Sequence, residues 1–185
     1  MMEKQRYWRN ADNQWGLVSR LLHWVMAIFI IGMLAGGLYM AELPNSPFKF
    51  ELYGIHKAIG IFILLFLIFR LVWRISQTIP TLLRLPQPQQ FLAKISAPLM
   101  YLVLFIMPLS GIAMSQAGGH PISVFGWVTL PEMIGKNPEL GKIAATIHQT
   151  TAWILIALII MHILAAFYHQ FCRKDYLLTR MWKKI

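Results

Sequence analysis

The sequence predicts an all-α protein, a transmembrane four-helix bundle. Hydrophobic residues make up 57% of the 185 residues and charged residues only 13%, whereas a soluble domain usually carries about 25% charged residues. The charges are clustered, so they leave four long apolar stretches. Three histidines lie inside such stretches and a fourth lies at the start of another. An ionisable side chain at membrane depth needs a partner, so these histidines are candidate functional residues.

The four stretches cover about residues 17–40, 52–75, 95–117 and 143–172. Each is longer than the roughly 20 residues that a helix needs to cross a hydrocarbon core about 30 Å thick. Backbone groups in lipid must be hydrogen-bonded within the protein, so each stretch should be a helix. Turn-forming and polar residues mark the connections: Pro44 and Pro47; Pro80, Pro86, Pro88, Gln87, Gln89 and Gln90; Gly118, Gly119, Pro121, Pro131 and Pro138. We therefore expect one integral-membrane domain over residues 1–185.

Lysine and arginine residues predict the orientation of the bundle. Thirteen of the 17 lie in the N-terminal segment through Arg20, in the second connection with its flanks, or in the C-terminal tail. The other four are Lys49, Lys57, Lys136 and Lys142. Positive charge favours the cytoplasmic side, so both termini should be cytoplasmic. The net charge of +10 lies beside apolar stretches rather than in a separate patch, which excludes nucleic acid as the expected partner. The first stretch is too long for a cleavable signal peptide, so it should remain as the first span.

The depths of the four histidines match two by two. His23 in the first span and His162 in the fourth should lie at one level on the cytoplasmic side, while His56 in the second span and His148 in the fourth should lie near the outer side. His148 and His162 are 14 residues apart, which corresponds to about 21 Å along a helix axis. At about 100° per residue both point to the same helix face.

Two histidines at one level can fill both axial positions of a haem iron, which favours electron transfer over oxygen binding. The single cysteine, Cys172, is not in a C-x-x-C-H motif, so covalent c-type attachment is excluded and b-type haem is expected. The predicted architecture is therefore a four-helix bundle with two haems between the helices, each held by two histidines. A histidine-based metal transporter is an alternative, but no Asp or Glu lies deep in any span, and divalent cations favour such ligands.

Several motifs resemble the bacterial cytochrome b561 family. Leu22-His23-Trp24 followed by Ala27 resembles its opening motif, and His56-Lys57-x-x-Gly60 with Arg70-x-x-Trp73-Arg74 resembles its second span. The run Pro108-Leu109-Ser110-Gly111, the loop over residues 117–126, and His148, His162 and His169 are similar to the third and fourth spans and the outer loop. The resemblance covers nearly the whole chain in order. It implies a di-haem b protein of the bacterial inner membrane, with His23 and His162 on the cytoplasmic-side haem and His56 and His148 on the periplasmic-side haem.

The resemblance also implies roles for other residues, because some members are similar to superoxide oxidases, which pass electrons from superoxide outside to ubiquinone near the inner face. His169 would give a hydrogen bond or a proton to the quinone, which needs protons when it is reduced. Lys57 adjoins His56 and would add positive charge for superoxide. Arg20, Arg70 and Arg74 lie level with the inner haem and would bind its propionates, since guanidinium suits carboxylate.

Three functions remain open from the sequence. The first is a superoxide:ubiquinone oxidoreductase. The second is a cytochrome subunit without a catalytic site of its own, which relays electrons between a partner dehydrogenase or hydrogenase and the quinone pool. The third is the metal transporter. The lipid bilayer is a partner in all three.

Overall fold

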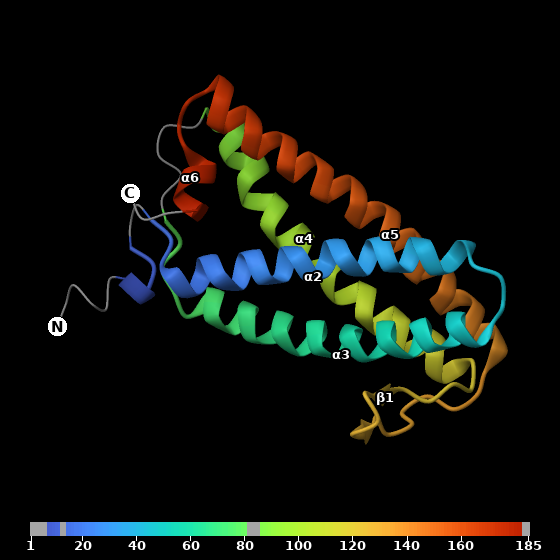
Figure 1. Ribbon diagram of the computed structural model, residues 1–185. Helices are drawn as coiled ribbons and strands as arrows, with labels where there is room; N and C mark the ends of the chain where they lie inside the picture. The colour runs from blue at the N-terminus through green and yellow to red at the C-terminus, as the bar shows by residue number, and fades with distance from the viewer. Residues whose placement is uncertain (1–6, 12–13, 81–85, 183–185) are drawn as a thin grey trace.

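The computed structural model describes residues 7–11, 14–80 and 86–182. Four long helices account for most of them: α2 (Leu17–Glu42), α3 (Pro47–Ile75), α4 (Gln87–Ala117) and α5 (Pro138–Phe167) (Figure 1). A π-helical turn, η1 (Tyr168–Cys172), continues α5, and a short helix, α6 (Leu177–Trp182), follows. The four long helices, with α5 and η1 taken together, are each long and apolar enough to cross a membrane. The expected all-α bundle is confirmed, and the chain is a multi-pass membrane protein.

Three of the helices begin earlier than the apolar stretches predict. α3 begins at Pro47 and α5 at Pro138, and both follow a residue whose side chain accepts a backbone hydrogen bond: Ser46 from Lys49 and Asn137 from Leu140. A cap followed by proline is a strong helix start because proline lacks an N–H that would otherwise be unpaired. α4 begins at Gln87, so the glutamines of the second connection belong to the helix instead of to a loop.

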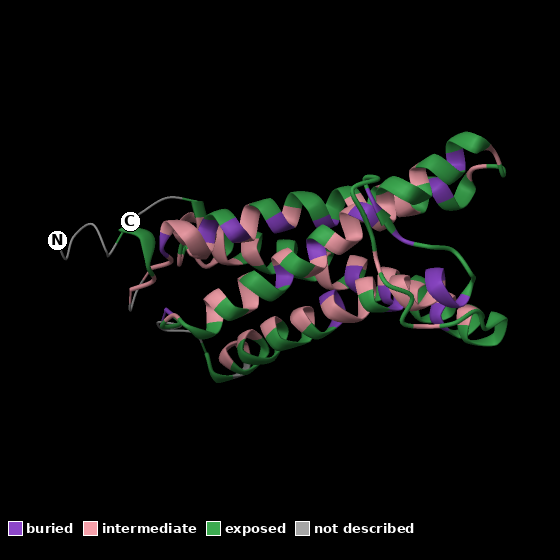
Figure 2. Ribbon diagram, turned by 90° about the horizontal axis from the view of Figure 1, so that it is seen from below, coloured by how far each residue is buried: buried purple, intermediate pink, exposed green. Residues whose placement is uncertain are grey.

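The helices pack as two pairs, α2 against α3 and α4 against α5, with further contact between α3 and α4. The buried core includes Met26, Leu67, Leu104 and Leu155, one from each long helix. Most of the remaining apolar side chains are exposed on the outside of the bundle (Figure 2). In water this surface would be unfavourable, but it is the surface expected for helices that face lipid.

The two ends of the bundle differ. At the end where α2 begins, which we call the terminal end, the Trp24 indole donates to the carbonyl of Met181 (2.9 Å) and so holds α6 against α2. At the opposite end, the loop end, a small hairpin of β1 (Ser123–Val124) and β2 (Val128–Thr129) follows α4. The hairpin turn places Phe125 and Gly126 at positive φ, which is the backbone twist that tight antiparallel hairpins favour.

Candidate functional site

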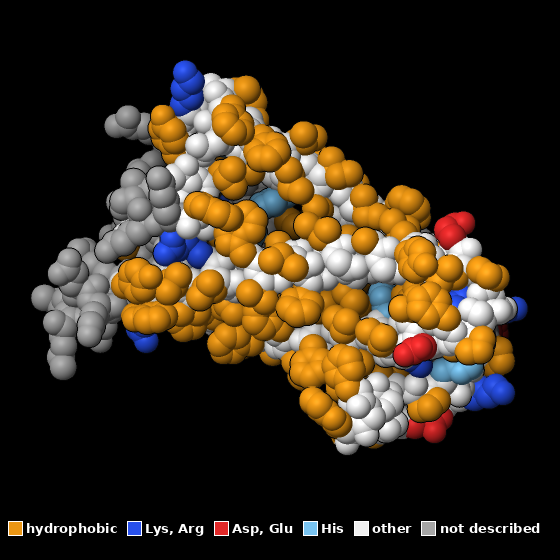
Figure 3. All heavy atoms as spheres, in the orientation of Figure 1, with side chains coloured by type: hydrophobic (Ala, Val, Ile, Leu, Met, Phe, Trp, Pro, Cys, Tyr) orange, Lys and Arg blue, Asp and Glu red, His pale blue; other side chains and the backbone are white. Residues whose placement is uncertain are grey.

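The terminal end of the bundle brings together His23 of α2 and His162 of α5. Their ring centroids are 6.1 Å apart and the rings are tilted by 54°. His23 is half-buried and His162 is exposed. The space-filling view shows histidine in a recess between α2 and α5 (Figure 3). An exposed imidazole at this depth would face hydrocarbon unless another group covered it, and that is a costly position for a polar side chain.

The loop end brings together His56 of α3 and His148 of α5, with ring centroids 6.4 Å apart. The Nδ1 of His148 lies 2.9 Å from the carbonyl oxygen of Met107. A carbonyl only accepts, so Nδ1 carries the proton and Nε2 keeps its lone pair for a metal. Gly111 leaves room for this ring, because a Cβ there would lie only 3.1 Å from Cε1 of His148.

The spacing of both histidine pairs fits one metal ion between two imidazoles. A metal–imidazole nitrogen bond is about 2.0–2.1 Å long, so two rings on opposite sides of one ion have centroids about 6 Å apart. α2 also passes close to the pair at the loop end, because a Cβ at Gly37 would lie 3.5 Å from Cε1 of His56. Two neutral nitrogen donors without a carboxylate suit a haem iron. These residues fit b haems, and their use as axial ligands stays a prediction.

The three predicted basic residues lie at the terminal end but make different contacts. Arg70 places Nη2 3.1 Å from Nδ1 of His23. Arg70 and Arg74 each lie 5.7 Å from the ring of Tyr101, on α4. Arg20 is buried and donates from Nη1 to the carbonyl of Trp182 (3.3 Å), while its Nε has no hydrogen-bond partner among the described residues. Haem propionates would give these cations further acceptors, since among the described residues Nε of Arg20 has none.

Lys57 lies next to His56 but its amine is not free. Its Nζ donates to the carbonyl of Pro121 at 2.8 Å and to the hydroxyl of Ser115 at 3.3 Å. Lys57 therefore fastens the loop after α4 onto α3, which the sequence did not suggest. Its predicted role toward superoxide stays a prediction, and it would have to act from this fixed position.

His169 lies in η1, away from both histidine pairs along the chain, and its Nδ1 is 2.7 Å from Oδ2 of Asp175. Both side chains are half-buried. Sequence reasoning singled out His169 and missed Asp175. Within the described part of the chain, no group of three or more His, Cys, Asp and Glu side chains is arranged to hold a metal ion.

Comparison with known proteins identifies the family. The family model of prokaryotic cytochrome b561 matches residues 14–184. The chain belongs to this family. It is also similar to "Cytochrome b561 homolog 2" of Escherichia coli (strain K12), with 35% identity over 177 residues that cover 95% of this chain and 94% of the relative.

Two further relatives are more distant. "Cytochrome b561 homolog 1" of Escherichia coli (strain K12) is 29% identical over 174 residues, covering 91% of this chain and 97% of the relative. "Probable superoxide oxidase CybB" of Yersinia pestis is 26% identical over 164 residues, covering 88% and 92%. Membership of the cytochrome b561 family makes this chain a membrane electron-transfer protein and implies haem b as its cofactor. The predicted family and its electron-transfer function are confirmed at this level.

Two residues of this cytochrome b561 site were not found from the sequence. The ring of Tyr101 lies 5.7 Å from the guanidinium groups of both Arg70 and Arg74, and Asp175 is bonded to His169. Ser110 was noted only as part of a motif, and the structure places its hydroxyl 3.2 Å from Nδ1 of His148. Tyr101 is an ordinary residue in an apolar helix and carries no signal. Asp175 did carry a signal in the sequence, because it is the only acidic residue among the described residues of the terminal end.

Proposed function

We propose that this cytochrome b561 holds two b haems, one between His23 and His162 and one between His56 and His148, and carries electrons between the two membrane faces. The observation that carries the proposal is that both pairs use the same helix, α5, at opposite ends of one bundle. Each haem, when bound, supplies a one-electron carrier. A shared helix keeps the two carriers at a constant separation, which an electron-transfer chain needs.

The proposed reaction oxidises superoxide at the periplasmic face and reduces ubiquinone near the cytoplasmic face. Two superoxide ions give two molecules of dioxygen and two electrons, and one quinone takes two electrons and two protons to become quinol. The protons come from the side of the membrane where the quinone is reduced. The similarity to the protein named as a probable superoxide oxidase supports this choice of donor.

We assign quinone reduction to the terminal end of the bundle. The membrane that the bundle spans is the bacterial inner membrane. The excess of lysine and arginine on that side supports a cytoplasmic position for both termini. His169 would give a proton or a hydrogen bond to the quinone. Arg20, Arg70 and Arg74 would bind the propionates of the haem at this end.

We assign superoxide oxidation to the loop end of the bundle. Lys57 holds its positive charge beside His56 and under the loop that follows α4. A fixed cation near the outer haem would raise the local concentration of an anion such as superoxide. The charge acts through its field, so the hydrogen bonds of the amine do not remove this effect.

The decisive experiment uses purified, haem-loaded protein in detergent. Superoxide is generated enzymatically, haem reduction is followed by absorbance, and ubiquinone is then added. We expect reduction that superoxide dismutase prevents, followed by reoxidation that depends on quinone. If superoxide leaves the haem oxidised while chemically reduced haem is still reoxidised by quinone, the chain is a relay cytochrome that takes its electrons from a partner protein. A chain that purifies without haem under haem-sufficient expression would exclude both functions.

A further inference from the structure

After the fourth span the chain leaves regular α-helical geometry, and the irregular backbone surrounds the carboxylate of Asp175. α5 ends in the π-helical turn η1, and such turns often occur at functional sites. Lys174 and Tyr176, on either side of Asp175, both have φ of 57°. Residues other than glycine rarely adopt this left-handed conformation, which costs on the order of 1–3 kcal/mol each. The surrounding contacts must therefore stabilise this backbone.

This backbone turns Asp175 back onto the helix end that it has just left. Its carboxylate oxygen Oδ2 lies 2.7 Å from Nδ1 of His169, and its amide donates to the carbonyl of His169 at 3.2 Å. Gln170 holds the other side of the turn, since its Oε1 accepts from the amide and hydroxyl of Thr179 on α6. His169 and Asp175 are therefore clamped together by contacts before and after them in the chain.

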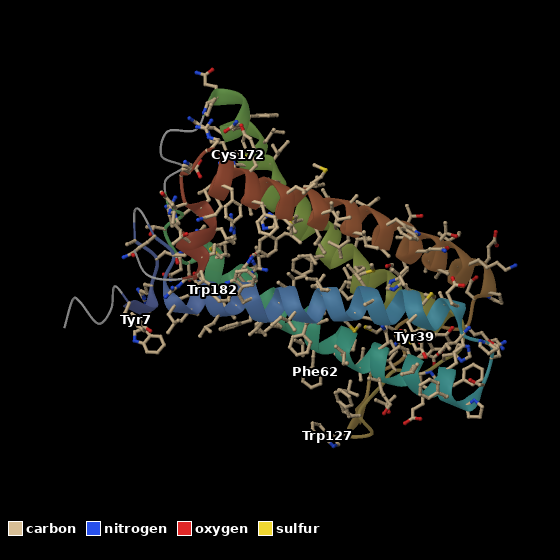
Figure 4. The ribbon with its side chains drawn as sticks, turned by 45° about the horizontal axis from the view of Figure 1, so that its top comes forward. Tyr7, Tyr39, Phe62, Trp127, Cys172 and Trp182 are labelled. Carbon is tan, nitrogen blue, oxygen red and sulfur yellow. The ribbon has the colours of Figure 1, made fainter. Side chains whose placement is uncertain are left out.

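α6 also links this turn to the helix of the inner histidine pair. Its last residues accept hydrogen bonds from Arg20 and Trp24 of α2. Figure 4 shows Trp182 beside the start of α2, and Cys172 at the far end of the same segment, where α5 ends. The turn is thus attached to both helices that carry His23 and His162.

Asp175 lies among cations. Arg173 places Nε 3.4 Å from Oδ2 of Asp175. The pKa of the Arg180 guanidinium is lowered by burial, and the nearby carboxylate of Asp175 offsets part of this shift. The second carboxylate oxygen, Oδ1, is buried and has no hydrogen-bond partner among the described residues.

We propose that Asp175 is the positioning residue for His169 in quinone reduction, an inference that rests on the function proposed above. By accepting from Nδ1–H, the carboxylate keeps one imidazole proton on that nitrogen, so Nε2 is the nitrogen that exchanges a proton with the quinone. In this step Nε2 first takes a proton from the cytoplasmic solvent, and its N–H bond then breaks as an O–H bond forms on the reduced quinone. The ring returns to the form protonated at Nδ1 alone, and the step repeats for the second proton. The two electrons per quinone would come from the haems that the proposed function requires.

The test compares Asp175→Asn with wild type, with Asp175→Glu, and with Glu139→Gln as a control carboxylate in the first turn of α5 at the other end of the bundle. Haem content and absorption spectrum show that each variant is folded. The haem is reduced chemically and ubiquinone is added in H₂O and in D₂O. We expect Asp175→Asn to slow reoxidation about 10- to 100-fold, by analogy with the loss of a carboxylate that orients a metal-bound histidine, and to increase the solvent isotope effect. Asp175→Glu should restore part of the rate, and Glu139→Gln should match wild type.

A second measurement does not depend on turnover. Nitrogen-15 NMR of labelled histidine, with the His169 signals assigned through His169→Gln, reports which ring nitrogen carries the proton. We expect Nδ1 to be protonated in wild type, and this preference to be lost in Asp175→Asn, because an amide can also donate to Nδ1.

The outcomes separate the two proposals. If reduced wild-type protein does not react with quinone, the proposed quinone reduction is wrong and the assignment of Asp175 is wrong with it. If wild type reacts and folded Asp175→Asn reacts as fast with the same isotope effect, only the role of Asp175 is wrong. Slower reoxidation with an unchanged isotope effect and an unchanged His169 tautomer would also overturn it, because that result describes a structural residue.

Discussion

The guanidinium of Arg70 on α3 lies 3.1 Å from Nδ1 of His23 on α2. Arginine only donates hydrogen bonds, so Nδ1 accepts here and the imidazole proton is on Nε2. A histidine that binds a metal through Nε2 needs the opposite tautomer, with the proton on Nδ1. Iron binding at His23 therefore requires Arg70 to leave this nitrogen. The released guanidinium would then be free to bind a haem propionate.

This relationship predicts the effect of Arg70→Gln on redox potential. A nearby cation stabilises the reduced haem, which carries one negative charge more than the oxidised haem. Removing the cation should lower the midpoint potential of the inner haem on the order of tens of millivolts and leave the outer haem unchanged. A spectroelectrochemical titration of the purified protein measures both potentials. Lys94→Gln is the control, because Lys94 is an exposed cation on α4 at the same end of the bundle. Equal shifts in both haems after Arg70→Gln would contradict the assignment of Arg70 to one haem.

The two histidine pairs predict selective haem loss. His56→Ala should remove one of the two haems, because the iron at the loop end loses one of its two axial nitrogens while the inner pair keeps both. His23→Ala should remove the other haem. The ratio of haem to protein, measured by the pyridine haemochrome method, should fall from two to about one in each variant. Retention of both haems in His56→Ala would exclude the proposed pairing, and loss of both would show that the two sites depend on each other for folding.

The sequence was sufficient to predict the four spans because membrane helices are long, continuous and strongly apolar. The depths of the histidines in those spans also predicted that His23 lies near His162 and His56 near His148, while their use as haem ligands stays a prediction. The sequence was less accurate for the helix starts, since Ser46 with Pro47 and Asn137 with Pro138 act outside the apolar stretches. The contact of Asp175 with His169 could not be predicted, because it requires a π-helical turn and two left-handed residues that no periodic pattern encodes. The contact of Arg70 with His23 depends on how two helices are rotated about their axes, which a single sequence leaves open.

Lys57 should have two separable effects at the loop end. Lys57→Met keeps the alkyl chain but removes the donor to Pro121 and Ser115. The loop over residues 118–137 should then open more often, because a hydrogen bond from a charged group contributes about 1–3 kcal/mol where water is excluded and less at a half-exposed site like this one. Limited proteolysis measures the opening. The rate of haem reduction by superoxide should also fall several-fold and become less sensitive to salt.

Lys142→Met provides the comparison for Lys57, because Lys142 is exposed at the same end of the bundle. It removes the same formal charge without releasing the loop. If both variants slow the reaction equally and neither changes proteolysis, then net charge rather than the position of Lys57 controls the reaction with superoxide.

Gly111 should be needed for the outer haem because of the space that it leaves. In Gly111→Ala, the new Cβ would lie 3.1 Å from Cε1 and 3.3 Å from Nδ1 of His148. The ring must then shift and weaken its hydrogen bond to Met107, which selects the tautomer that binds iron. Haem occupancy at the loop end should fall, while the inner haem stays bound. Gly54→Ala is the control, since its Cβ would meet nothing within 4 Å. Both substitutions favour the helix by about 1 kcal/mol, so a loss of haem in Gly111→Ala alone must come from the contact with His148. Equal haem content in the two variants would mean that the ring tolerates the methyl group and that Gly111 has no part in holding His148.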